Sequence, residues 1–287
     1  MAKEEKKRGK VVIPYLYELR EKGEPISWLT AYDFPTAQLM EQAQIEMILV
    51  GDSASMTVYG NSSTLPITMD TLINHCRAVR NAAPNCFVVG DMPFLSYQCS
   101  AEDAIRNAGR FMKEAGCDAV KLEGGVRVAP MVKGIVNAGI PVIGHIGLTP
   151  QSSAMLGGFK VQGKSAESAK ALLEDALALQ DAGAFSVLLE CVPTPVSQLI
   201  KEKAEVLIFG IGAGPGLDGQ LLILHDIIGL FQTFQPKFVK QYVKVSDIIL
   251  KALNEYISDV KNKSFPAKEH EYSISAEELE KLRSMKL

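Results

Sequence analysis

The fold is decided by residues 100–147, which read SAEDAIRNAG RFMKEAGCDA VKLEGGVRVA PMVKGIVNAG IPVIGHIG. Ser100 offers a side-chain oxygen to the free amides of a first helical turn, and Gly116 can adopt the left-handed conformation that ends a helix. A buried-type strand is predicted at 119–122, after which a second helical stretch leads into a second strand at 141–146. This alternation of helix and strand is typical of βαβ units around a parallel sheet.

The same alternation runs along the whole chain. A doubly wound open sheet is the competing architecture, but no G-x-G-x-x-G motif follows the first strand, and the glycine run at 210–216 has a different spacing. A weak repeat, Ala-Gly before a strand, favours a regular array of units. We therefore expect an α/β fold of the (β/α)8 TIM-barrel type. Its eight strands are predicted at 26–31, 47–50, 87–90, 119–122, 141–146, 186–189, 206–211 and 221–224.

The chain is predicted to form one domain over 1–287, because no Pro/Gly/Ser-rich linker divides it. Residues 1–10 are expected to be a flexible tail, followed by a short N-terminal helical segment. Residues 241–287 are expected to be a C-terminal helical extension. Within that extension an amphipathic pattern predicts a helix at 244–260, and a capping-box pattern predicts a terminal helix that begins at Ser275.

Composition excludes several classes of function. The 30 Lys and Arg against 33 Asp and Glu leave a net charge of −3 and no basic stripe, so nucleic acid is not expected as a partner. The apolar runs are far shorter than the roughly 20 residues that span a bilayer, and the charged N-terminus does not resemble a secretory signal. The 5 cysteines are scattered without a paired spacing, which predicts reduced thiols in the cytoplasm. Cys191 is interpreted as a small apolar residue, since no activating base lies near it in sequence.

Carboxylates follow several of the predicted strands. In a barrel the carboxyl ends of the strands form one rim, where catalytic residues gather. Asp52, Asp91, Glu123 and Glu190 should therefore meet at one mouth. Their mutual repulsion is costly unless a cation neutralises part of it or a proton is shared. Oxygen ligands from Asp and Glu suit a hard divalent ion such as magnesium.

Each rim residue also has a purely structural interpretation. Asp52 could cap a helix or turn, and Asp91 could be a strand-end residue satisfied by a loop amide. Glu123 could form an ion pair with Lys121, two positions away on the same face of the strand. His145 fits a buried histidine satisfied by hydrogen bonds, although we favour a role as a hydrogen-bond donor in the site.

Glu190 stands apart from the other three carboxylates in the sequence. It ends the apolar run 187–189, so partial burial should raise its pKa toward that of a useful base. A salt-bridged strand end is the alternative. The glycine run at 210–219 also has two interpretations, a phosphate cradle or a tight loop whose glycines serve backbone geometry, and the sequence leaves both open.

Short motifs occur beside the predicted strand ends in a characteristic order. They are TAYD at 30–33, GDS at 51–53, NH at 74–75, DMPFLSY at 91–97, VKLEGG at 120–125, GHIGLTPQ at 144–151, IGAG at 211–214, DGQ at 218–220 and PKFVK at 236–240. Together they resemble the ketopantoate hydroxymethyltransferase (3-methyl-2-oxobutanoate hydroxymethyltransferase) family over about residues 14–240.

The resemblance implies a function as well as a fold. It implies Mg²⁺-dependent transfer of a one-carbon unit from 5,10-methylenetetrahydrofolate to 3-methyl-2-oxobutanoate, which gives 2-dehydropantoate (ketopantoate) on the route to pantothenate and coenzyme A. It also implies a homo-oligomer, a decamer in the family. The family's site residues fall on Asp52, Asp91 and Glu123 as metal ligands, on Asp52, Ser53, Asp91 and Lys121 as substrate contacts, and on Glu190 as proton acceptor. We add His145 to the predicted substrate contacts.

Two other functions were weighed against this one. A magnesium-dependent carbon–carbon lyase or mutase of the phosphoenolpyruvate mutase and isocitrate lyase type also works on a barrel rim, but such enzymes carry a cysteine in a Lys-Lys-Cys-Gly-His-like loop that is absent here. A non-catalytic barrel that binds an anionic metabolite is the second alternative. Retention of the rim carboxylates together with Lys121 argues against it.

Overall fold

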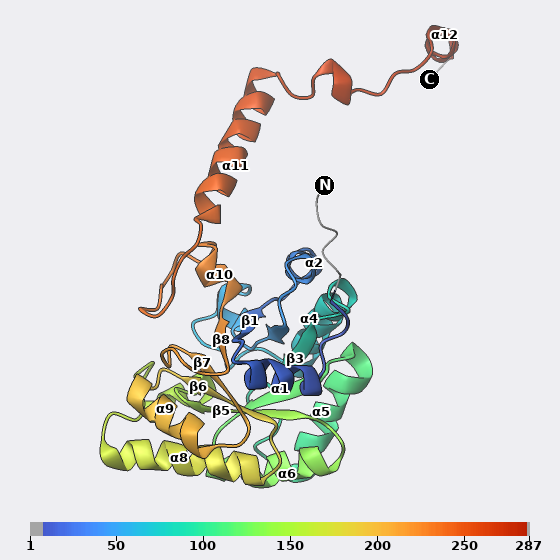
Figure 1. The fold of residues 1–287 in the computed structure, drawn as a ribbon. Helices are drawn as coiled ribbons and strands as arrows, with labels where there is room; N and C mark the ends of the chain where they lie inside the picture. The colour runs from blue at the N-terminus through green and yellow to red at the C-terminus, as the bar shows by residue number, and fades with distance from the viewer. Residues whose placement is uncertain (1–7, 286–287) are drawn as a thin grey trace.

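Eight parallel strands close into a barrel in the order of the sequence, which confirms the predicted fold class (Figure 1). The computed structural model describes residues 8–285. The strands are β1 (Ile26–Thr30), β2 (Met47–Val50), β3 (Phe87–Asp91), β4 (Ala119–Glu123), β5 (Val142–Gly147), β6 (Ser186–Glu190), β7 (Leu207–Ile211) and β8 (Gly219–Leu222).

Helices surround the barrel, and several begin and end where local chemistry predicts. The Ser100 side chain accepts a hydrogen bond from the Asp103 amide at the start of α5, and Gly116 ends that helix with φ 67°. The long helices are α1 (Ile13–Lys22), α2 (Phe34–Gln42), α4 (Met69–Ala82), α5 (Ala101–Ala115), α6 (Ala129–Asn137), α8 (Ala166–Asp181) and α9 (Thr194–Lys203). Short helical turns are α3 (Ala54–Thr57), η1 (Val126–Val128), η2 (Pro150–Ser152), α7 (Ser153–Leu156) and α10 (Leu224–Ile227).

The eighth strand lies earlier in the chain than predicted. It was expected at 221–224, but it spans Gly219–Leu222 and pairs with both β1 and β7. Gly219 was read as part of a loop. A glycine is required at this point of the strand for a steric reason, because a Cβ there would lie 2.4 Å from the Ile26 carbonyl oxygen.

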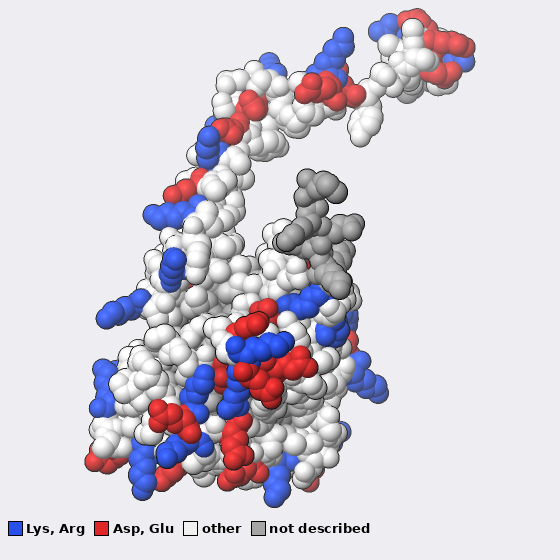
Figure 2. All heavy atoms as spheres, viewed as in Figure 1, with Lys and Arg blue, Asp and Glu red and all other residues white. Residues whose placement is uncertain are grey.

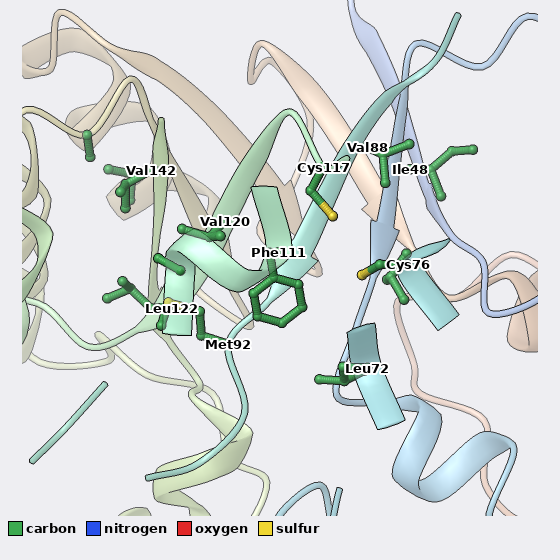
Figure 3. Close-up of a cluster of buried hydrophobic side chains, with 14 of the residues drawn as sticks. Ile48, Leu72, Cys76, Val88, Met92, Phe111, Cys117, Val120, Leu122 and Val142 are labelled. Carbon is green, nitrogen blue, oxygen red and sulfur yellow. The ribbon is translucent and has the colours of Figure 1, made fainter. Parts of the chain in front are cut away.

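Apolar side chains form two cores. One fills the barrel interior, where the rings of Trp28 and Phe209 meet edge to face with centroids 5.2 Å apart. The other lies between the strands and the outer helices (Figure 3). There the ring of Phe111 on α5 packs against Gly90 of β3, so closely that a Cβ at Gly90 would lie 2.4 Å from it. The close approach of α5 to the sheet therefore depends on a glycine in β3.

The C-terminal region is helical, as predicted. It contains α11 (Val245–Asn262), η3 (Lys268–His270) and α12 (Ala276–Ser284). In Figure 1 α11 leads away from the barrel, and none of its residues is buried. Ser275 caps α12 by accepting a hydrogen bond from the Glu278 amide.

The first described residues contact the barrel. Arg8 donates hydrogen bonds of 2.6 Å to the carbonyl oxygens of Gln44 and Ile45, and Lys10 forms a 2.6 Å ion pair with Asp118. The remainder of the predicted tail lies outside the described residues. Within the described chain, no helix combines the length and apolarity needed to cross a membrane. Acidic and basic side chains are intermingled on the face shown in Figure 2.

Candidate active site

The parallel register brings the predicted rim residues to one level of the barrel. Asp91 is paired with Lys121 across β3 and β4, and Glu123 is paired with His145 across β4 and β5. Lys121 Nζ lies 2.8 Å from Asp91 Oδ1 and 3.8 Å from Glu123 Oε1. The structural interpretation paired Lys121 with Glu123 on the same strand. Lys121 instead lies closer to Asp91 on the neighbouring strand, and it contacts both carboxylates.

Asp52 directly follows β2 and belongs to the same cluster. Its backbone amide donates a 2.9 Å hydrogen bond to Asp91 Oδ2. Asp91 therefore accepts a hydrogen bond from a loop amide, as its structural interpretation predicted. The Asp52 side chain makes no capping bond to α3, which begins at Ala54 and has Ser53 as its N-cap. The Ser53 hydroxyl instead lies 2.8 Å from the hydroxyl of Tyr32.

Burial controls the charge state of this cluster. It raises the pKa of Asp52 to about 6, with the charge of Glu123 adding to the effect, and it raises the pKa values of Asp91 and Glu123 to about 7. Burial alone disfavours the Lys121 ammonium, but the charges of Asp91, Glu123 and Asp52 outweigh it and raise the Lys121 pKa. Three largely buried carboxyl groups thus share one ammonium, and an additional cation would stabilise their ionised forms.

The oxygen atoms of the cluster fit a hard cation. Asp91 Oδ1 and Glu123 Oε1 are buried, and among the described residues only the Lys121 ammonium and the His145 ring lie within ion-pair distance of them. Within residues 8–285, however, no group of three or more His, Cys, Asp or Glu side chains is arranged to hold one metal ion. Mg²⁺ commonly binds through one or two carboxylates and keeps several waters, so this donor set still suits it. The assignment of all three carboxylates as ligands stays a prediction.

Glu190 and His145 form a separate pair at the edge of the cluster. His145 Nε2 lies 3.1 Å from Glu190 Oε2, although the contact lacks the alignment of a full hydrogen bond. Burial, together with the charge of Lys121, lowers the pKa of His145, while burial raises the pKa of Glu190. A neutral His145 can accept from Lys121 Nζ, 3.2 Å from its Nδ1, and present its Nε2 hydrogen toward Glu190. Among the described residues no Lys or Arg is paired with Glu190, so the salt-bridged interpretation does not hold for it.

Two residues without a predicted role connect the cluster. Gln151 donates from its backbone amide to Glu123 Oε2 (2.9 Å) and from its side chain to Asp52 Oδ2 (3.0 Å). The Tyr97 hydroxyl donates to Gln151 Oε1 (2.7 Å) and accepts from the Glu123 amide (3.1 Å). Both lie inside motifs that the sequence analysis quoted. Their polar character in buried loops was the available signal.

A cavity of about 340 Å³ at this end of the barrel contains all the predicted site residues in its lining. These are Asp52, Ser53, Asp91, Lys121, Glu123, His145 and Glu190. The glycine run that follows β7 packs beside the cavity. Gly212 has φ +64°, and a Cβ on it would lie 2.6 Å from the ring of Phe238. Backbone geometry and close packing therefore account for this glycine.

Known proteins resemble this chain over most of its length. The sequence profile of the family described as ketopantoate hydroxymethyltransferase matches residues 10–268. The 3-methyl-2-oxobutanoate hydroxymethyltransferase of Alkaliphilus metalliredigens is 54% identical over 93% of this chain and 95% of its own. The enzyme of the same name from Moorella thermoacetica is 52% identical over 92% of this chain and 98% of its own.

Solved structures share the fold at much lower identity. Phosphonopyruvate hydrolase, solved as a complex with oxalate and Mg²⁺, has a TM-score of 0.59 at 12% identity over 95% of each chain. Phosphoenolpyruvate phosphomutase from Streptomyces platensis subsp. rosaceus has a TM-score of 0.60 at 14% identity, over 96% of this chain and 97% of its own. At such identity the likeness shows a common barrel fold alone. The profile match and the relatives near 50% identity carry the assignment: the chain belongs to the ketopantoate hydroxymethyltransferase family.

Proposed function

We propose that the chain transfers a hydroxymethyl unit from 5,10-methylenetetrahydrofolate to 3-methyl-2-oxobutanoate in a Mg²⁺-dependent reaction. The product is 2-dehydropantoate, which feeds pantothenate and coenzyme A synthesis. One observation carries the proposal. A single cavity is lined by a buried carboxylate cluster and by a separate carboxylate, Glu190, which forms no ion pair with a Lys or Arg within residues 8–285. The names of the relatives support the reaction class.

Asp52, Asp91 and Glu123 are the residues that would hold Mg²⁺. A bound Mg²⁺ acts as a Lewis acid toward the 2-oxo group and makes the neighbouring carbon acidic. The buried oxygens of Asp91 and Glu123 support this assignment, because among the described residues they share a single ammonium, that of Lys121.

Lys121, Ser53 and His145 are proposed to bind the substrate oxygens. Lys121 supplies a buried positive charge, and its raised pKa keeps it protonated at neutral pH. The Ser53 hydroxyl is oriented by Tyr32, and the His145 ring is oriented by Lys121 on one side and Glu190 on the other. Groups fixed in this way hold the reacting atoms in line at little entropic cost during the reaction.

Glu190 is proposed to remove the proton from C3 of the oxo acid. The proton moves to the carboxylate, and the electron pair left at C3 forms a bond to the methylene carbon of the donor. The two C–N bonds of that carbon break and water supplies the hydroxyl oxygen. Tetrahydrofolate leaves with one proton from water and the proton that Glu190 removed. Two features support this role. Burial raises the pKa of Glu190, which makes it a stronger base than an exposed glutamate, and the neutral His145 beside it leaves its charge uncompensated.

Product formation tests the proposal directly. The full chain is incubated with Mg²⁺, 5,10-methylenetetrahydrofolate and 3-methyl-2-oxobutanoate, and 2-dehydropantoate is sought by mass spectrometry. We expect product with the wild type and a rate at least 100-fold lower with Asp91→Ala, which removes an oxygen ligand and the partner of Lys121. Absence of product from the folded wild type would overturn the proposal.

We also propose a cytoplasmic homo-oligomer, a decamer as in the family. All 5 cysteines are free, which suits a reducing compartment. The support for assembly is α11, where Ile249, Leu253, Tyr256 and Val260 lie on one face and are exposed. In Figure 2 charged side chains lie along one side of this helix and uncharged atoms along the other. An exposed apolar face of this kind marks an interface.

The assembly is tested by light scattering on the full chain. Leu253→Lys places a charge on the apolar face of α11 and should give a smaller particle. Ser258→Lys, on the opposite face of the same helix, is the matched control and should leave the mass unchanged. A monomeric wild type would refute oligomerisation, and an unchanged mass for Leu253→Lys would exclude this face as the interface.

A further inference from the structure

The cavity has an outer part that the acidic cluster does not use. Its inner end is polar, whereas its mouth is lined by Phe159 from the loop after α7 and by Phe231 and Phe234 from the segment between α10 and α11. Phe159 is 55% exposed and Phe234 is 66% exposed. Large aromatic rings that line a cavity and remain exposed to water are typical of a ligand site, because a bound ligand would bury them.

A buried carboxylate lies in the same outer part. Asp226 on α10 lines the cavity and is only 7% exposed. In the described chain its carboxyl accepts no hydrogen bond and enters no ion pair, and burial raises its pKa to about 6. A carboxyl group that lines a cavity and has no donor among the described residues is free to accept hydrogen bonds from a ligand. Asp226 therefore indicates a ligand edge that carries N–H groups.

Two lysines give the mouth a positive charge. Lys160 and Lys237 line the cavity next to the aromatic rings, and both are exposed. Neither forms an ion pair with a residue in the range 8–285. A ligand that reaches from the cavity into solvent would meet these ammonium groups with its outer end, which favours an anionic tail.

These features describe a ligand that is larger than the oxo acid. The oxo acid is small and anionic, so the polar inner end suffices for it. The full cavity of about 340 Å³ lies in the range of sites that enclose a drug-sized molecule. Its outer part offers apolar faces for a flat ring, an acceptor for the ring edge and cations for a tail.

We propose that the ring system of the folate donor stacks on Phe159, Phe231 and Phe234. The amino-pyrimidine edge of the pteridine donates hydrogen bonds to Asp226. The glutamate carboxylates of the tail face Lys160 and Lys237. The inference rests on the proposed function, and it adds the part of the cavity that recognises the one-carbon donor and places it beside the oxo acid.

The test separates the two substrates. In D₂O with Mg²⁺ and without folate, exchange of the C3 proton of 3-methyl-2-oxobutanoate reports on the inner end alone. The transfer reaction gives a KM for 5,10-methylenetetrahydrofolate and a KM for the oxo acid. Phe234→Ala should raise the folate KM by about 5- to 100-fold, as loss of one stacking ring does. The oxo-acid KM and the exchange rate should stay within about twofold of the wild type.

Three further variants sharpen the result. Phe234→Tyr keeps the ring and should restore the wild-type folate KM, which a general loss of folding would not allow. Asp226→Asn removes the charged acceptor and should raise the folate KM by about tenfold or more. Phe34→Ala is the matched control, because Phe34 is 45% exposed but does not line the cavity, and it should change neither KM.

The outcomes distinguish the inference from the proposed function. A wild type that shows neither exchange nor transfer refutes the proposed function itself. A wild type that is active while Phe234→Ala and Asp226→Asn leave the folate KM unchanged refutes the donor site alone. Equal changes in the folate KM, the oxo-acid KM and the exchange rate also refute it, because the rings would then act on the whole cavity.

Discussion

Gln151→Leu removes the side-chain amide that holds the Asp52 carboxylate without changing the volume of the side chain greatly, and it keeps the backbone amide that donates to Glu123. The wild-type amide donates to Asp52 Oδ2 and to the Met92 carbonyl oxygen, both at 3.0 Å. It also accepts from the Tyr97 hydroxyl, which can turn toward the Glu123 carbonyl oxygen 3.2 Å away. Two buried acceptors are thus left without a donor. At about 1–3 kcal/mol each, the variant should lose about 2–6 kcal/mol of stability.

The same variant should weaken Mg²⁺ binding. The hydrogen bond from Gln151 lowers the pKa of Asp52, against the dominant effect of burial, so its loss should raise that pKa further. A carboxyl that is more often protonated at neutral pH is a poorer ligand. Urea unfolding of the metal-free protein gives the change in stability, and titration calorimetry with Mg²⁺ gives the change in affinity.

Gln98→Leu is the matched control. Gln98 reaches the same Gln151 oxygen, but at 3.4 Å and in a half-buried position. Its replacement should cost less than about 1 kcal/mol and leave Mg²⁺ affinity unchanged. If the two leucine variants were equally stable and bound Mg²⁺ equally well, Gln151 would not organise the cluster and the reasoning would fail.

Two further predictions concern stability. Gly90→Ala should lower stability by about 1–3 kcal/mol in a thermal or urea unfolding experiment, because its Cβ would lie 2.4 Å from the Phe111 ring. Gly109 lies on α5, the helix that carries Phe111, and has open space around it, so Gly109→Ala should cost no stability. Without metal, the pKa is raised to about 6 for Asp52 and to about 7 for Asp91 and Glu123. Their contribution to the free energy of unfolding is therefore fully present below about pH 4 and is lost as the pH rises through 6 to 7. The lowered pKa values of the buried His145 and His225 act in the opposite direction, but the three carboxyl groups outnumber these two histidines. The urea midpoint of the metal-free protein should therefore fall across that window, with excess Mg²⁺ reversing the fall, and a rising midpoint without metal would contradict the assignment.

The strands and the rim were accessible from the sequence because both depend on local signals. Each buried strand is a short apolar run, and each parallel strand delivers its last residue to the same end of the barrel. Asp91, Glu123 and Glu190 were placed correctly at strand ends for that reason, and the strands in fact include them. The predicted barrel thus led to side chains that line one cavity in the structure.

Other features depend on contacts between distant loops, which the local sequence does not reveal. Gln151 follows β5 and Tyr97 follows β3, and their hydrogen bond exists only because the barrel brings the two loops together. Phe159 and Phe234 line one cavity although they belong to separate segments of the chain. The start of β8 was missed for a different reason. The sequence pattern predicts a loop glycine at Gly219, but it is a strand residue that lacks a side chain because a Cβ would clash with the Ile26 carbonyl oxygen.

The role of Glu190 as the base is the central claim, and C3 exchange measures it without the folate donor. The wild type, incubated in D₂O with Mg²⁺ and 3-methyl-2-oxobutanoate, should replace the C3 proton with deuterium. Glu190→Gln keeps the contact with His145 but cannot accept the proton, so exchange should slow by about 10²- to 10⁴-fold while Mg²⁺ affinity is retained. Exchange at the wild-type rate in Glu190→Gln would contradict the account.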